Sequence, residues 1–286
     1  MIVAIVGPTG VGKTKMSIEL AKMLDAIIIN CDAVQIYKEL NIGSAKATKN
    51  EQEGIPHYLL DIKSINEDYT VKDYQTDLRR LLEKYQKRNI IIVGGTGLYL
   101  CAGLMDYHFE EEDNHLNYED LSNEQLYELA LKKDPKVNIH QNNRVRLIRF
   151  LNKKTLSQKI EPKLLYENVQ FIGLTTQRDN LYNIINQRVD QMITKGLLEE
   201  TKSLYEKYPS SRVLHSAIGY KELIQYLDGN VSYQQAIDKI KQNSRHYAKR
   251  QYTWFNNKMN INWFEVNYED FNETINSVKT FLEKQS

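Results

Sequence analysis

Residues 1–14 of the chain read M-I-V-A-I-V-G-P-T-G-V-G-K-T, and they combine a predicted strand with a glycine-rich loop. The apolar run from residue 2 to residue 6 has the pattern of a strand buried in a parallel sheet. Residues 7–14, GPTGVGKT, match the motif G-x-x-x-x-G-K-[ST], in which backbone N–H groups cradle phosphates. Such a loop needs a strand before it and a helix after it, because the helix N-terminus also faces the anion. Residues 13–24 supply that helix, since their apolar positions recur at helical spacing.

The loop residues are therefore candidates for binding a phosphate or diphosphate: Gly7, Pro8, Thr9, Gly10, Val11, Gly12, Lys13 and Thr14. The Lys13 ammonium is expected to meet the terminal phosphate, and the Thr14 hydroxyl to bind Mg²⁺. A glycine-rich turn without a ligand is the alternative, and the flanking strand and helix argue against it. The motif does not say which phosphates are bound.

Further apolar runs resemble buried strands, and an amphipathic stretch resembles a helix. The strand-like runs are 26–29, 90–93 and 169–174, and the amphipathic stretch is 71–85. Strands that alternate with helices predict an α/β domain with a parallel sheet flanked by helices. Ligands bind at the carboxyl ends of the strands in such sheets, where Gly7, Asp32 and Gly94 are expected to lie.

The composition is that of an ordinary globular protein. Of its 286 residues 41% are hydrophobic and 26% are charged, with a formal net charge of +1. Two cysteines, Cys31 and Cys101, cannot form a disulfide framework, which favours the cytoplasm. No apolar run approaches the length of a membrane span. The N-terminal run is a predicted strand rather than a signal peptide, because it is short and leads directly into the loop.

The chain divides into three predicted parts. Residues 1–105 form the first part of the α/β core. Residues 106–140 form a small, acidic and mainly helical insertion, with helix expected from about Ser122. Residues 141–286 complete the core and add a helical, basic C-terminal part.

Asp32 follows the second apolar run, within the stretch INCDAVQIY (29–37). It lies near the phosphate loop if the first two strands are neighbours. Its carboxylate can hold Mg²⁺ through water, or act as a general base toward a nucleophile beside the phosphate. Capping of the strand end is a third role open to an aspartate at this position.

The stretch GGTGLYL (94–100) follows the run 90–93. A phosphate-loop protein that hydrolyses nucleotides usually has an aspartate for the metal at the end of such a strand, and this strand leads into Gly-Gly-Thr instead. Two glycines let a backbone approach a ligand closely, and Thr96 adds a hydroxyl. A tight strand-to-helix turn without a ligand fits equally well.

Two segments are basic and lack carboxylates. Segment 239–258 has six Lys or Arg residues, interleaved with Tyr247, Tyr252, Trp254 and Phe255. Segment 141–154 contains Arg144, Arg146, Arg149, Lys153 and Lys154. Basic residues interleaved with aromatic ones suit a polyanion with exposed bases, because cations bind phosphates and rings stack on bases. Either run taken alone is more often a solvated helix face whose aromatic residues belong to the core.

These features, in this order, resemble the tRNA dimethylallyltransferases, also called tRNA isopentenyltransferases. The resemblance covers most of the chain. It rests on GPTGVGKT (7–14), CDAVQIYKELNIGSAKAT (31–48), IPHYLLDI (55–62), EDYTVKDYQTD (67–77), GGTGLYL (94–100), QRDNLYNIINQRVDQMITKGLLEE (177–200), AIGYKEL (217–223) and RHYAKRQYTWF (245–255). The lack of a C-terminal zinc-finger spacing resembles the bacterial form of the family.

The resemblance implies a P-loop NTPase-like fold and a prenyl transfer. The dimethylallyl group would pass from dimethylallyl diphosphate to the exocyclic amine of adenosine 37 in tRNA. Loop 7–14 would hold the diphosphate with Mg²⁺, and Arg188 would add a cation to it. Asp32 matches the general base of the family, and Thr96 matches the threonine that holds the amine and the base in line. The resemblance is to enzymes that we expect to act as monomers.

The resemblance also implies which residues contact tRNA, with Gln35 reading the edge of the extruded adenine. The implied contacts are Asp32, Ala33, Val34, Gln35, Thr96, Val145, Arg146, Leu147, Ile148 and Arg149. In the second basic run Arg245, Lys249 and Arg250 are expected to face ligand or phosphate.

Two other functions account for part of the sequence. A small-molecule or nucleoside kinase using ATP and Mg²⁺ explains the loop and Asp32, and leaves GGTGLYL and the basic runs without a role. A non-catalytic nucleic-acid-binding module explains the basic runs, and leaves Asp32 and Thr96 without one.

Overall fold

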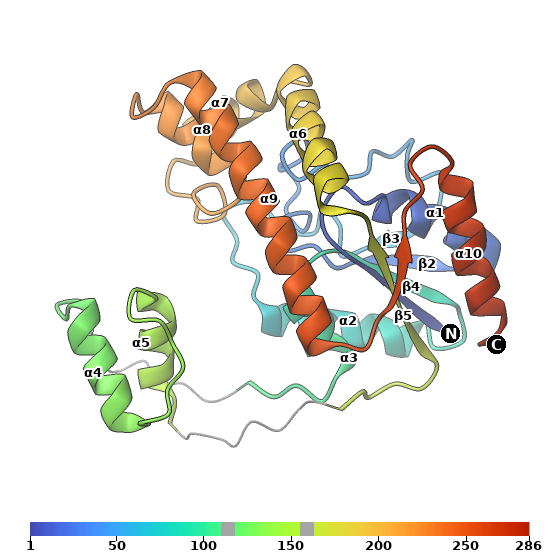
Figure 1. Ribbon diagram of the computed structural model, residues 1–286, viewed down its shortest axis with the longest axis horizontal. Coiled ribbons are helices and arrows are strands. Elements are labelled where there is room, and N and C mark those ends of the chain that lie inside the picture. Colours follow the sequence, from blue (N-terminus) through green and yellow to red (C-terminus); the bar gives the residue numbers. More distant parts are fainter. Residues whose placement is uncertain (110–117, 155–162, 286) are drawn as a thin grey trace. The chain divides into compact units, whose positions relative to one another are not determined.

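The computed structural model describes residues 1–109, 118–154 and 163–285 (Figure 1). Helices separate most of the strands along the chain, and four consecutive helices lie between the last two strands. Their bounds are β1 Ile2–Val6, α1 Lys13–Leu24, β2 Ile27–Asn30, β3 His57–Tyr58, α2 Val71–Lys84, β4 Ile90–Val93, α3 Gly97–Leu104, α4 Asn123–Lys133, α5 Arg144–Asn152, β5 Val169–Thr175, α6 Arg178–Thr194, α7 Leu197–Lys207, α8 Tyr220–Leu227, α9 Tyr233–Lys258, β6 Asn262–Glu265 and α10 Phe271–Glu283.

The strands form one parallel sheet in the order β3-β2-β4-β1-β5-β6. Strand β1 is central, and Ile5 pairs with Val93 on one side and with Ile172 on the other. The predicted α/β fold with a parallel sheet flanked by helices is confirmed. Strands β3 and β6 were not predicted, because both are short edge strands and the sequence of β6, NWFE, lacks a buried apolar pattern.

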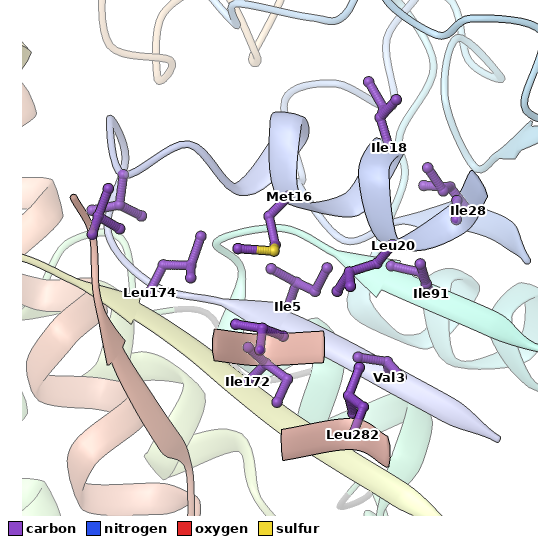
Figure 2. Close-up of a cluster of buried hydrophobic side chains, with 14 of the residues drawn as sticks. Val3, Ile5, Met16, Ile18, Leu20, Ile28, Ile91, Ile172, Leu174 and Leu282 are labelled. Carbon is purple, nitrogen blue, oxygen red and sulfur yellow. The ribbon is translucent and has the colours of Figure 1, made fainter. Parts of the chain in front are cut away.

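One face of the sheet packs against α1 and α10. Figure 2 shows Met16 and Leu20 of α1 meeting Ile5 of β1 and Ile172 of β5, with Leu282 of α10 beside them. Each of these side chains is almost fully buried. The residues that alternate with this set face the other way and are buried as well. They are Ala4, Ile27, Ile29, Ile90 and Ile92.

The strand order decides which loops meet at the carboxyl edge of the sheet. Strands β1 and β2 are not neighbours, because β4 lies between them. The loop after β4, which carries Thr96, therefore separates the phosphate loop after β1 from the segment after β2 that carries Asp32. The sequence had linked Asp32 to the phosphate loop through neighbouring strands, and the link runs instead across the loop after β4.

A second compact unit spans Asp106–Lys163, and the rest of the chain forms the first. In the second unit Leu126 and Ala130 of α4 pack against Leu147 and Leu151 of α5 around a small core of their own. The insertion was predicted to end at residue 140. The structure extends this unit to residue 163, because α5 completes its core. The acidic residues 110–113 lie outside the described residues.

Candidate functional site

The loop motif forms the turn between β1 and α1. Gly7 and Gly12 have φ angles of 136° and 82°, values that strain residues with a side chain. A Cβ atom on Gly7 would lie 2.4 Å from the carbonyl oxygen of Leu174, and one on Gly12 would lie 2.7 Å from the ring of Phe271. Both glycines are therefore required by the conformation of the loop and by its close packing.

The other loop residues differ in how they face solvent. Pro8 and Val11 are buried, and Val11 belongs to the core beside α1. A contact of Val11 with a ligand is therefore limited to its backbone. Thr14 is exposed at the start of α1. The backbone N–H of Thr9 already donates to a side chain of α9, which is described below.

Lys13 lies folded over its own loop. Its Nζ donates to the carbonyl oxygens of Gly7 at 3.0 Å and Pro8 at 2.7 Å. The pKa of Lys13 is lowered to about 7, mainly by burial and also by the charge of Arg188, while the carboxylate of Asp32 acts in the opposite direction. A cation desolvated in this way favours an anionic ligand, because the ligand replaces the lost hydration.

Arg188 reaches the same site from α6. Burial also lowers its pKa, and the carboxylate of Asp32 raises it. These three charged groups thus interact electrostatically, although Lys13, Arg188 and Asp32 come from different parts of the sequence. The structure therefore brings together two cations and one carboxylate that the sequence analysis had selected separately.

Asp32 and Thr96 are fixed by backbone hydrogen bonds. The Asp32 carboxylate accepts from the N–H of Val34 at 2.9 Å, and the Asp32 N–H donates to Oδ1 of Asn30 at 3.1 Å. The Thr96 hydroxyl accepts from the N–H of Ala33 at 3.1 Å. The loop after β4 thereby holds the segment that carries the carboxylate, and Asp32 stays only half-buried.

Gln35 is oriented by a neighbouring loop. Its Nε2 donates to the carbonyl oxygen of Ser44 at 3.1 Å. Loop 41–44 is in turn held by Glu200 of α7, whose carboxylate accepts from the N–H of Ile42 at 3.0 Å and from the hydroxyl of Tyr220 at 2.6 Å. Helices α7 and α8 thus support the loop against which the Gln35 amide rests.

Helix α9 supplies site residues that the sequence analysis did not select. Gln251 is 5% exposed, and its Nε2 donates to the carbonyl oxygen of Gly95 at 3.0 Å. Its Oε1 accepts from the N–H of Thr9 at 3.0 Å. The Tyr247 hydroxyl, one turn earlier, lies beside the side chains of Thr96 and Gln251, and burial raises its pKa. The spacing of Tyr247 and Gln251 within RHYAKRQYTWF puts both on one helix face, a signal present in the sequence.

The glycines of GGTGLYL are explained by packing within the protein. A Cβ atom on Gly94 would lie 2.0 Å from the carbonyl oxygen of Cys31. On Gly95 it would lie 1.9 Å from Nε2 of Gln251, and on Gly97 it would lie 2.1 Å from the ring of Trp254. Of the two interpretations left open by the sequence, close approach of a ligand or a tight turn, these contacts favour the tight turn.

The expected tRNA contacts of residues 145–149 lie on α5 in the second unit. Leu147 is fully buried in the core of that unit, so its side chain does not face a ligand. Val145 is 68% exposed, and Arg146 and Arg149 are exposed as well. Arg144 has a structural role, since its guanidinium donates to the backbone carbonyl oxygens of Tyr118, Glu119 and Leu121.

The basic run on α9 divides between protein contacts and solvent. Arg245 donates to Oδ1 of Asn186 at 2.6 Å and lies over the ring of Tyr182. Lys249 and Arg250 are exposed. Phe255 is 1% exposed and belongs to the core, so this aromatic residue of the run does not face a ligand.

A metal ion at this site would depend on few protein ligands. Among residues 1–109, 118–154 and 163–285, no cluster of three His, Cys, Asp or Glu side chains is arranged to hold a metal. The exposed hydroxyl of Thr14 fits Mg²⁺ only if the phosphates of a ligand supply most of the oxygen atoms. Within the same described residues, no helix has the length and apolarity to cross a membrane.

Comparison with known proteins gives a consistent result. The family model described as IPP transferase matches residues 35–258. The tRNA dimethylallyltransferase of Anoxybacillus flavithermus is 46% identical over 99% of this chain and 96% of its own length. That of Bacillus subtilis is 45% identical over 93% of this chain and 90% of its own length.

Solved structures are similar over nearly the whole chain. The tRNA delta(2)-isopentenylpyrophosphate transferase of Staphylococcus epidermidis superimposes with a TM-score of 0.77 at 36% identity, covering 100% of this chain and 99% of the other. A eukaryotic dimethylallyltransferase acting on tRNA superimposes with a TM-score of 0.81 at 27% identity, covering 98% of this chain and 77% of the other.

Proposed function

The chain belongs to the IPP transferase family, and on that premise we propose that it is a tRNA dimethylallyltransferase. It transfers the dimethylallyl group of dimethylallyl diphosphate to N6 of adenosine 37 in the tRNA anticodon loop. The products are N6-isopentenyladenosine and diphosphate. The observation that carries the proposal is the convergence of Lys13 and Arg188, two desolvated cations, with the carboxylate of Asp32.

The two cations suit the leaving group. As the C–O bond of the donor breaks, its electron pair leaves with the diphosphate, and negative charge grows on the bridging oxygen. Three sets of groups stabilise that charge: Lys13, Arg188 and backbone N–H groups of loop 7–14. They therefore stabilise the transition state more strongly than the bound donor. Mg²⁺, bound by Thr14 and the diphosphate, would add Lewis-acid stabilisation of the same charge.

Asp32 suits the acceptor. The lone pair of the adenine amine is delocalised into the ring, so N6 attacks the allylic carbon weakly. As the N–C bond forms, positive charge grows on N6, and Asp32 removes it by taking the N6 proton. Thr96 keeps the Asp32 segment in place through the N–H of Ala33. The target base must leave its stack to reach these groups, and Gln35 is proposed to read its edge.

We propose that tRNA phosphates contact the exposed cations of α5 and α9, which are Arg146, Arg149, Lys249 and Arg250. Leu147 is excluded from side-chain contacts by its burial. We also propose that the enzyme acts in the cytoplasm, because its substrate tRNA is found there. We further propose that it is a monomer. Sedimentation with and without tRNA measures the oligomeric state.

The proposal is tested with purified protein, Mg²⁺, dimethylallyl diphosphate labelled in the prenyl group, and an anticodon stem-loop containing A37. We expect the label in N6-isopentenyladenosine after nuclease digestion, and none with a stem-loop that carries G37. ATP replaces the donor in a parallel reaction. Phosphorylation of a small acceptor by ATP, without prenyl transfer, would overturn the proposal in favour of a kinase.

A further inference from the structure

Gln251 joins two loops at the carboxyl edge of the sheet. Its Oε1 accepts from the N–H of Thr9 in the phosphate loop, and its Nε2 donates to the carbonyl oxygen of Gly95 in the loop after β4. Both distances are 3.0 Å, and the side chain is 5% exposed. One buried amide therefore connects segments that follow two adjacent strands, β1 and β4.

Each end of this connection leads to a group in the proposed reaction. Thr9 belongs to loop 7–14, over which the ammonium of Lys13 is folded. Gly95 precedes Thr96, whose hydroxyl holds the N–H of Ala33, next to Asp32. The amide thus lies between the groups proposed for the diphosphate donor and those proposed for the acceptor amine.

The Gln251 amide is closely packed by its neighbours. The Gln251 amide occupies the space where a side chain on Gly95 would begin, since a Cβ there would lie 1.9 Å from Nε2. Tyr247, on the same face of α9, lies beside both Gln251 and Thr96. The amide itself has no charge, does not titrate, and uses both of its ends within the protein.

We propose that Gln251 is a positioning residue that fixes loop 7–14, which holds the diphosphate donor, relative to Asp32 and Thr96. The proposal rests on the proposed function and deepens it, because the allylic carbon and N6 must meet in line while they are held by different loops. A misplacement of about 1 Å between reacting groups lowers a rate by about a hundredfold. The role is one of alignment, and binding of the diphosphate alone does not require it.

Two variants remove the connection from opposite sides. Gln251→Met keeps the length and volume of the side chain and removes both hydrogen bonds. Gly95→Ala forces the Gln251 amide away, and every close neighbour of the new Cβ belongs to that flexible side chain. Gln242→Met is the matched control, because Gln242 lies exposed on the same helix.

We expect both variants to lower kcat by about tenfold to a hundredfold, while KM for the donor changes by less than about threefold. The control is expected to keep the wild-type kcat. A purely structural role would lower the folded fraction and leave kcat per folded molecule unchanged, so the folded fraction is measured by near-ultraviolet circular dichroism. A wild-type kcat in Gln251→Met would overturn the proposal.

Hydrogen exchange tests the connection without turnover. Inorganic diphosphate is expected to slow amide exchange in both 7–14 and 94–99 of the wild-type protein, and only in 7–14 of Gln251→Met. Protection of both segments in the variant, or of 7–14 alone in the wild type, would refute the connection. A wild-type protein that shows the expected exchange pattern but transfers no prenyl group would instead refute the proposed function.

Discussion

The hydroxyl of Thr96 accepts a hydrogen bond from the backbone N–H of Ala33 at 3.1 Å, while the Thr96 N–H donates to the carbonyl oxygen of Cys31 at 3.1 Å. Thr96 therefore holds the chain on both sides of Asp32. Because the carboxylate of Asp32 also accepts from the N–H of Val34, its position is set by the backbone of this short segment. The orientation of the proposed base thus depends on a residue in the loop after a different strand, β4.

Thr96→Val keeps the shape of the side chain and removes the acceptor for the Ala33 N–H. We expect the free energy of unfolding to fall by about 1 kcal/mol, because a half-buried donor loses its partner. We expect kcat to fall about tenfold, since the Asp32 segment becomes free to shift. Urea unfolding and single-turnover transfer measure the two effects. Thr96→Ser is the control, and the interpretation fails if the serine and valine variants behave alike.

Asp32→Asn separates the general base from the structural role of the same side chain. Asparagine keeps an oxygen that can accept from the N–H of Val34, but it does not accept a proton from N6. We expect kcat to fall by about a hundredfold or more. Affinity for inorganic diphosphate should stay equal or rise, because a negative charge near Lys13 and Arg188 is removed. Calorimetry measures the affinity, and unchanged turnover would remove Asp32 from its proposed role.

The sequence predicted the parts of this site that are encoded locally. The strands β1, β2, β4 and β5 are mostly apolar runs, and the phosphate loop is a contiguous motif between a strand and a helix. Edge strands β3 and β6 were missed, because an edge strand is half-exposed and short and has little hydrophobic pattern to recognise. These elements could be predicted because the pattern that specifies each of them lies within one short stretch of sequence.

The parts that depend on long-range packing were not predictable in the same way. That β4 separates β1 from β2 follows from strand pairing across the whole domain. The face of α9 that carries Tyr247 and Gln251 is visible from its spacing, but its partners, Thr9 and Gly95, are not. Leu147 was included in a basic segment as a whole, although its spacing to Leu151 already marked the buried side of the helix.

Lys13 predicts an unusual pH dependence of diphosphate binding. Burial lowers its pKa from 10.5 to about 7, so the ligand-free protein loses this positive charge as the pH rises above about 7. A bound diphosphate favours the charged form, so binding takes up a proton in that range. We therefore expect the contribution of Lys13 to affinity to fall by up to about tenfold for each pH unit above 7.

Calorimetric titration of inorganic diphosphate between pH 6 and pH 9 provides the measurement, with these limits chosen about the lowered pKa of Lys13. The ligand gains negative charge over the same range, which acts in the opposite direction. Lys13→Met isolates that effect, since the variant lacks the titrating ammonium. The difference between the two pH profiles reports Lys13. Parallel profiles would show that Lys13 stays charged throughout.

Substitutions of two neighbouring arginines of α5 are expected to have different effects. Arg146 is exposed, whereas the guanidinium of Arg144 donates to three backbone carbonyl oxygens within the second unit. We expect Arg146→Gln to weaken tRNA binding and to reduce the slope of log K against log salt by about 0.7 to 0.9, the loss of one phosphate contact. Arg144→Gln should instead destabilise the second unit, because it leaves the carbonyl oxygens without their donor.

The two effects are separated by measuring tRNA affinity at several salt concentrations together with limited proteolysis. Arg144→Gln is expected to speed cleavage within Asp106–Lys163, and Arg146→Gln to leave the cleavage rate unchanged. An Arg146→Gln variant with the wild-type salt slope would show that this arginine makes no phosphate contact. Such a result would leave Arg149 as the exposed cation of α5 that is proposed to contact tRNA, because Leu147 is buried.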